Sequence, residues 1–234
     1  MKHKRRQRMR PATQRPKISW AVALFLCLAV GTGALLARLT IHQNTPTRSD
    51  LLPPLAFLPV YVRAAQMYHV PWAFLATINE IETNYDRVHP MISSAGAVGP
   101  MQFMPSTWRE YGANVLHPAR EGDPMDLLDA VFACAKLLHV WGMTPKLTNA
   151  YWIARFAGAY DAGPGRWNND SVETVHYRQT AVRLYHMIRR DVIIPQSVVT
   201  YWDQLSLQQI ADIAAGRKDV SAGLRAHVRE DASG

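Results

Sequence analysis

The chain has 234 residues, enough for one domain with a substantial core and some additional segments. Its formal net charge is +8, but eight of the 26 basic residues fall within residues 1–17, which contain no acidic residue. The other 18 basic residues equal the 18 acidic residues in number, so the rest of the chain is neutral overall. A nucleic-acid-binding domain needs basic residues on the folded surface that meets the phosphates, so this distribution argues against nucleic acid as a partner.

An apolar stretch follows the basic leader, and residues 18–37 contain no charged side chain. Twenty helical residues span about 30 Å, the thickness of a bilayer's hydrocarbon core. We therefore expect a cytoplasmic leader at 1–17 and a single transmembrane anchor at 18–39 that leaves the rest of the chain outside the cytoplasm. A cleaved signal peptide, cut after small residues such as Ala29 and Gly31, is the alternative. Both interpretations place the domain outside the cytoplasm.

The remaining chain is predicted to be mostly α-helical. A polar, proline-containing linker at 40–59 leads to a domain at 60–190, and a partly disordered extension at 191–234 ends the chain. Apolar periodicity and capping residues predict helices at 60–68, 73–85, 105–111, 126–141, 150–160 and 173–189, and a short one capped by Ser206 and Gln209. The β-branched run at 192–200 is the only candidate for a short strand.

Cysteine and histidine usage limits the chemistry of the domain. Cys27 lies in the apolar stretch, so Cys134 has no partner for a disulfide within the domain and is expected to be a buried apolar residue. The nine histidines include no His-Glu-x-x-His motif and no close pair on one helical face. The sequence therefore predicts no metal site.

The predicted helix at 73–85 carries a candidate acid. At about 100° per residue, Glu82 falls on the same apolar stripe as Ile78 and Tyr85, whereas Glu80 lies about 200° away and is expected to face solvent. A carboxyl group on an apolar face has a raised pKa, as a general acid working near neutral pH requires. The alternative is that Glu82 lies at the edge of the stripe and pairs with Arg155.

A loop rich in Gly, Ala and Ser follows at 93–104, and Met101 and Gln102 in it offer apolar surface and hydrogen-bonding groups. Taken with the preceding helix, this loop resembles the signature of the soluble lytic transglycosylase family, which is related to goose-type lysozymes. The resemblance covers about residues 60–190. It rests on four ordered motifs: Glu82-Thr83-Asn84-Tyr85, Ser93-x-x-Gly96-Ala97-x-Gly99-x-Met101-Gln102-x-Met104-Pro105-x-Thr107, Ala159-Tyr160-Asp161-Ala162-Gly163 and Glu173-Thr174-x-x-Tyr177.

The resemblance implies a lysozyme-like helical bundle with a glycan-binding groove and no cofactor. It assigns the single catalytic acid/base to Glu82, and sugar contacts beside it to Ser93, Met101 and Gln102. It also implies that Tyr160 hydrogen-bonds near Glu82 and that Tyr177 lines the groove.

Asp161 departs from the family pattern, which has Asn at this position. Its carboxylate could raise the pKa of Glu82 and contact the substrate, or it could simply cap the turn at 162–163.

The implied activity is cleavage of the β-1,4 bond between N-acetylmuramic acid and N-acetylglucosamine in peptidoglycan, with formation of a 1,6-anhydro end. A muramidase-type hydrolase, with Asp161 or Asp86 as its second carboxylate, is one alternative. A non-catalytic glycan-binding scaffold of an envelope-spanning assembly is another. The expected partners are glycan strands and the membrane. Whether the protein also binds a partner in an envelope assembly is left open by the sequence.

Overall fold

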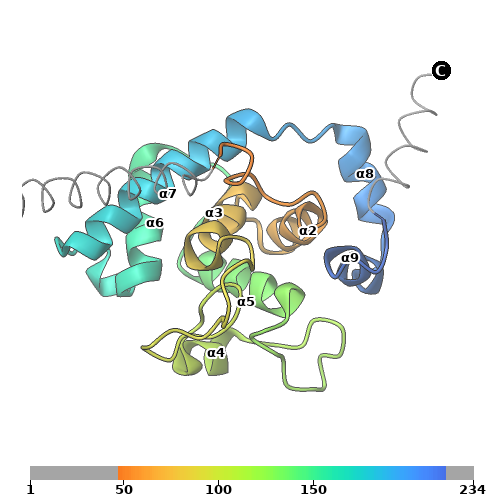
Figure 1. Ribbon diagram of the computed structural model, residues 1–234, viewed down its shortest axis with the longest axis horizontal. Coiled ribbons are helices and arrows are strands. Elements are labelled where there is room, and N and C mark those ends of the chain that lie inside the picture. Colours follow the sequence, from red (N-terminus) through yellow and green to blue (C-terminus); the bar gives the residue numbers. More distant parts are fainter. Residues whose placement is uncertain (1–46, 220–234) are drawn as a thin grey trace, which may run out of the picture. The chain divides into compact units, whose positions relative to one another are not determined.

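The computed structural model describes residues 47–219, which fold into helices joined by loops (Figure 1). Within these residues the only β-pairing is isolated bridges that join Val98 to Ile92 and to Phe103. The prediction of a mostly α-helical fold is therefore confirmed. The helices are α2 (Leu58–Tyr68), α3 (Trp72–Thr83), α4 (Pro105–Tyr111), α5 (Leu127–Val140), α6 (Ala150–Ala162), the 3-10 helix η1 (Pro164–Arg166), α7 (Val172–Asp191), α8 (Gln196–Gln204) and α9 (Leu207–Ala214).

Helix α3 lies at the centre of the domain, in contact with α2, α5 and α7 (Figure 1). It starts directly after Pro71, which is tolerated there because the first backbone N–H groups of a helix have no intrahelical partner. Its residues from Ala73 to Asn79 are all buried, so the helix is covered on every side. It ends at Asn84, whose left-handed conformation (φ 51°, ψ 52°) is one that Asn adopts more readily than most residues.

Side chains cap the starts of α5 and α9, and those at α9 are the predicted ones. The side chain of Asp126 accepts a hydrogen bond of 3.0 Å from the backbone N–H of Asp129 and so caps α5. Ser206 and Gln209 form the reciprocal capping box at the start of α9. Each cap satisfies backbone donors that a helix start leaves without partners.

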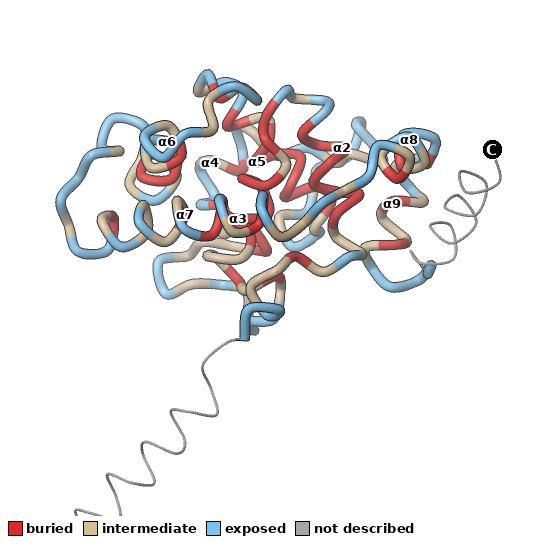
Figure 2. The backbone as a smooth tube through the Cα atoms, turned by 90° about the horizontal axis from the view of Figure 1, so that it is seen from above, coloured by how far each residue is buried: buried red, intermediate tan, exposed pale blue. Residues whose placement is uncertain are grey.

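The hydrophobic core runs from Leu58 in α2 to Ile213 in α9 and is richest along α2, α3 and α5 (Figure 2). Cys134 is completely buried in it, as predicted. The described residues 47–219 form a compact unit that contains this whole core, so the unit can fold by itself. None of the helices between residues 47 and 219 is long and apolar enough to cross a membrane. The predicted anchor at 18–39 lies outside the described residues.

The prediction of a strand at 192–200 is wrong. Only the segment up to Pro195 is extended, and α8 begins at Gln196. The β-branched run has no neighbouring strand to pair with, whereas Val198 and Trp202, four residues apart, bury one face of a helix against the core. The extension that begins at residue 191 therefore contains α8 and α9, while residues 220–234 lie outside the described part.

Candidate active site

Glu82 lies in the last turn of α3, where its side chain is only partly accessible to solvent. Burial raises the pKa of Glu82 to about 7, a hydrogen bond from Tyr177 lowers it, and the charge of Asp161 raises it further. Burial has the largest effect because it removes water from the charged form of the carboxyl group. Near neutral pH this carboxyl group is therefore present in both protonation states.

Tyr177 extends from α7 to the carboxyl group of Glu82. Its hydroxyl group donates a hydrogen bond of 2.6 Å to Oε1 of Glu82. Burial and the nearby charge of Glu82 raise the pKa of Tyr177 well above its usual value, so the phenol keeps its proton. The sequence analysis expected Tyr177 to line a groove and did not predict this direct contact with the candidate acid.

Tyr160 extends from α6 to the loop at 93–104. Its hydroxyl group donates a hydrogen bond of 2.6 Å to the backbone carbonyl of Met101, and its ring packs edge-on against Phe103. Burial raises the pKa of Tyr160, and the nearby charge of Glu82 adds to this effect. Tyr160 is thus within electrostatic reach of Glu82, and its hydrogen bond fixes the loop.

The loop at 93–104 is held by hydrogen bonds of its own polar side chains. The hydroxyl oxygen of Ser93 accepts from the N–H of Ala97 at 3.0 Å, and Nε2 of Gln102 donates to the carbonyls of Met91 and Gly99. Gly99 has a positive φ of 81°, and a Cβ atom there would lie 1.7 Å from the carbonyl oxygen of Pro124, so no other residue fits.

The structure therefore gives Ser93 and Gln102 a role in shaping the loop. The side chain of Met101 is completely buried, so the expected contact of this side chain with a sugar finds no exposed surface. Gln102 does line a cavity of about 230 Å³ together with Tyr160 and Asp161. Trp141 lines the same cavity, which combines polar groups and aromatic rings of the kind that bind sugars.

Asp161 is exposed at the end of α6, and its Oδ2 accepts a hydrogen bond of 2.6 Å from the hydroxyl group of Thr174 in α7. Thr174 is itself fixed, because its backbone N–H donates to Ser171 at the start of α7. The carboxylate is thus oriented by α7 rather than by the turn at 162–163. From this position its negative charge raises the pKa of Glu82.

A buried polar network links α3 to the loop, and the sequence analysis missed it. Nδ2 of Asn79 lies within hydrogen-bond distance of Thr83 (3.1 Å), Asp86 (2.9 Å) and the carbonyl of Pro100 (3.0 Å). The hydroxyl group of Thr83 also donates to the carbonyl of Pro100, at 2.9 Å, and Tyr61 donates to Oδ1 of Asn79. The available signal was an amide side chain on the buried face of an otherwise apolar helix, since such a group needs partners.

Two alternatives for the carboxylates can now be judged. Glu80 is half-buried rather than facing solvent freely, and burial raises its pKa while the charges of Arg87 and Arg183 lower it. This correction follows from the packing of α7 along α3. Arg155 does not pair with Glu82, because its guanidinium group lies over the rings of Trp152 and Trp167, 5.4 Å from each centroid.

Comparison with known families gives one match. The family model described as the transglycosylase SLT domain matches residues 60–180, a range that contains Glu82, the loop at 93–104, Tyr160 and Tyr177. None of the curated proteins and none of the solved structures with which the chain was compared matches it. Between residues 47 and 219, no group of three His, Cys, Asp or Glu side chains is arranged to hold a metal ion.

Proposed function

We propose, since the chain belongs to the transglycosylase SLT domain family, that it is a peptidoglycan lytic transglycosylase that leaves 1,6-anhydro-muramic ends. Membership supports activity on peptidoglycan glycan strands in general. The bond to be cleaved is the β-1,4 linkage between N-acetylmuramic acid and N-acetylglucosamine. The observation that carries the proposal is the partly buried carboxyl group of Glu82, with a pKa of about 7 and one fixed donor.

A pKa near neutrality suits a group that must first give a proton and then take one. Protonated Glu82 donates its proton to the glycosidic oxygen, and the C1–O4 bond breaks through an oxocarbenium-like state. The anionic carboxylate then accepts the proton of the muramic O6 hydroxyl group as O6 bonds to C1. The ring closes, Glu82 regains its proton, and no water is consumed.

Tyr177 stabilises Glu82 while its carboxyl group is deprotonated. Its hydroxyl group donates to Oε1 of Glu82, and this bond is stronger when the carboxyl group is charged. Among the described residues Oε2 receives no hydrogen bond, so this oxygen is available to the glycosidic and O6 atoms. The loop at 93–104 is fixed by Tyr160 and is joined by Asn79 to α3, the helix that carries Glu82.

Mass spectrometry of soluble products released from purified peptidoglycan tests the proposal. We expect muropeptides with an anhydro-muramic end, each lighter by one water than the corresponding hydrolysed product. Reducing ends throughout would identify a muramidase-type hydrolase instead. Binding to glycan strands without any released product would identify a non-catalytic scaffold.

The muramidase alternative has one observation in its favour, which is the carboxylate of Asp161 close enough to act on Glu82 electrostatically. A hydrolase of conventional mechanism needs such a second positioned carboxylate to activate water or to attack C1. The hydrogen bond from Thr174 gives Asp161 a fixed orientation. The product ratio therefore distinguishes the two reactions.

The same proposal includes the location of the enzyme. Peptidoglycan lies outside the cytoplasmic membrane, and the basic leader at 1–17 followed by the apolar run at 18–37 suits an anchor with a cytoplasmic N-terminus. The catalytic domain would then work on the periplasmic or cell-wall side, tethered by the linker at 40–59.

A further inference from the structure

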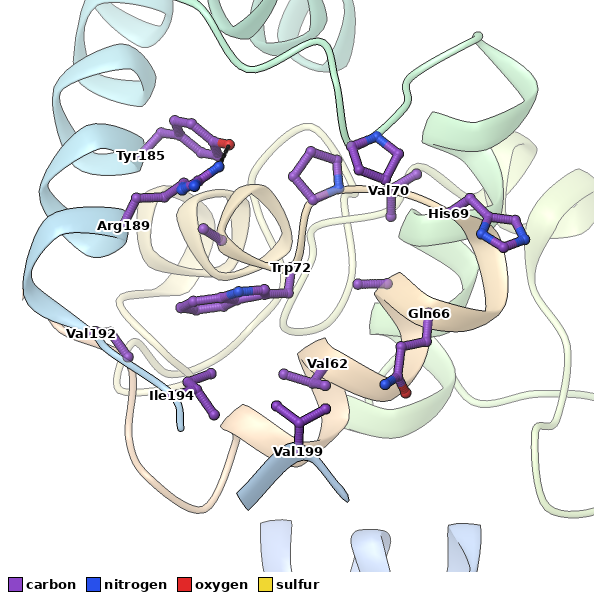
Figure 3. A pocket seen from close by; sticks show the side chains of 14 residues that line it. Val62, Gln66, His69, Val70, Trp72, Tyr185, Arg189, Val192, Ile194 and Val199 are labelled. Carbon is purple, nitrogen blue, oxygen red and sulfur yellow. Dashed lines mark hydrogen bonds between the residues drawn. The ribbon is translucent and has the colours of Figure 1, made fainter. Parts of the chain in front are cut away.

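A cavity of about 490 Å³ lies between α2, the start of α3, the end of α7 and α8 (Figure 3). The ring of Trp72, the first residue of α3, lies across it. Trp72 precedes Glu82 by ten residues, which is about 15 Å along the helix. The cavity is therefore separate from the candidate active site, although α3 and α7 contribute to both.

The walls of this cavity are largely apolar. Val62 of α2 and Val199 of α8 face Trp72, and Val192 and Ile194 of the extended segment between α7 and α8 close another side (Figure 3). Binding of an apolar group against these walls is favourable, because it removes apolar surface from water. A volume of this size lies within the range of small-molecule binding sites.

The polar groups of the cavity lie around its rim and are few. Arg189 of α7 contributes the charge, and its guanidinium group donates a hydrogen bond of 3.4 Å to the hydroxyl group of Tyr185. No carboxylate of residues 47–219 lies within ion-pair distance of Arg189. An arginine beside an apolar cavity and without an acidic partner is electrostatically suited to an anionic group.

We propose that this cavity binds a small amphiphile, namely a straight-chain carboxylate whose apolar body lies on Trp72 and whose head group meets Arg189. The concave site that several elements form favours a small ligand over a flat protein surface. The cation at the rim selects an anionic head group, and no other Lys, Arg, Asp or Glu side chain lines the cavity.

Titration of residues 47–234 with sodium dodecanoate, below its micelle concentration, tests the proposal. The signal is the NMR shift of the Trp72 indole N–H, assigned with Trp72→Phe. We expect a saturable shift with dodecanoate, and none with acetate or with dodecyltrimethylammonium, which keeps the chain but reverses the charge. An absent or unsaturable shift would overturn the proposal. Equal binding of the cationic probe would overturn it as well and would indicate a general apolar docking site for a protein segment.

Two substitutions test the head-group contact and the apolar contact separately. Arg189→Gln should raise the dissociation constant about tenfold, as loss of a hydrogen bond to a charged group predicts. Arg183→Gln, an exposed change on the same helix outside the cavity, should leave it unchanged. Val199→Trp should abolish binding by filling the cavity, with the melting temperature as the check of folding.

Unchanged affinity in Arg189→Gln would refute the assigned head-group contact. None of these measurements depends on Glu82 or on glycan cleavage. The binding proposal and the proposed function can therefore fail independently.

Discussion

The hydroxyl group of Tyr177 and Oε1 of Glu82 lie 2.6 Å apart, and this hydrogen bond joins α7 to the last turn of α3. This hydrogen bond and burial have opposite effects on the pKa of Glu82: the bond lowers it, and burial raises it. Together with the charge of Asp161, which raises it, these two effects give Glu82 a pKa of about 7. Such a pKa suits the proposed reaction, in which one group first donates a proton and then accepts one.

Replacing Glu82 with Gln should reduce glycan cleavage about a hundredfold or more, since the proton donor is lost and the shape is kept. Glu80→Gln is the matched control, because Glu80 lies on the same helix and is also partly buried. Release of soluble muropeptides over time measures both variants. Similar losses in the two would contradict the assignment of the acid to Glu82.

The same substitution should stabilise the fold at alkaline pH. The pKa of Glu82 is raised from 4.5 to about 7, so the charged form disfavours the folded state, increasingly from pH 4.5 to 7 and fully above pH 7. Removing the charge should then add on the order of 2–3 kcal/mol to the free energy of unfolding at pH 8. At pH 4, where Glu82 is protonated in both states, Glu82→Gln should change little. Denaturant unfolding at the two pH values measures the difference.

Tyr177→Phe should move the basic limb of the pH–activity profile upward by about one pH unit. The hydrogen bond from Tyr177 lowers the pKa of Glu82, so its loss raises that pKa and keeps the acid protonated to higher pH. The maximal rate should fall, because the anionic carboxylate loses its donor. Tyr151→Phe, an exposed change on α6, provides the control. A basic limb that stays in place would show that the hydrogen bond does not set the pKa.

The sequence predicts the helices and the partly buried position of Glu82, because both depend on local patterns. Apolar periodicity places Glu82 on the buried side of α3, and Asp126 and Ser206 mark helix starts by their own chemistry. Contacts between distant segments are different. Glu82 and Tyr177 are 95 positions apart in the sequence, and Asn79 and Pro100 are 21 apart, so no local pattern indicates that they meet. The direct bond of Tyr177, the anchoring of Asp161 by Thr174 and the network of Asn79 therefore required the structure.

Asn79→Ala should destabilise the domain by about 3 kcal/mol, because several buried polar groups would lose a partner. The carbonyl of Pro100 would keep only its bond from Thr83, so the loop at 93–104 should also become more mobile. Faster proteolytic cleavage within this loop, compared with cleavage elsewhere in the domain, measures the second effect. Thr200→Ala, which removes an exposed hydroxyl group on α8, is the control. A purely global loss of stability would show that Asn79 does not position the loop.

The topology can be tested on whole cells. We expect residues 50–234 to be accessible to protease from the outer side of the membrane, and the mature N-terminus to remain at Met1 or Lys2. The reason is the full-length apolar run behind a leader with eight cationic residues. N-terminal sequencing that begins near Thr32 or Ala34 would replace the anchor with a cleaved signal peptide and leave the export of the domain intact.

Asp161→Asn separates charge from shape at the position where this chain departs from the family pattern. An Asn side chain keeps the acceptor oxygen that Thr174 bonds, so the end of α6 should stay in place. The charge of Asp161 raises the pKa of Glu82, so its removal should lower that pKa and shift the basic limb of the activity profile to lower pH. Asp170→Asn, at an exposed residue 3.9 Å from Arg178, is the control for a general change in charge.

Asp161→Asn should also change the ratio of anhydro to hydrolysed products. A carboxylate beside the cleaved bond can orient a water molecule, which would divert part of the reaction from ring closure to hydrolysis. The anhydro fraction should therefore rise in Asp161→Asn, measured by mass spectrometry of the same digests. If both the pH profile and the product ratio stay unchanged, Asp161 serves only to tie α6 to α7 through Thr174, and its charge has no part in the reaction.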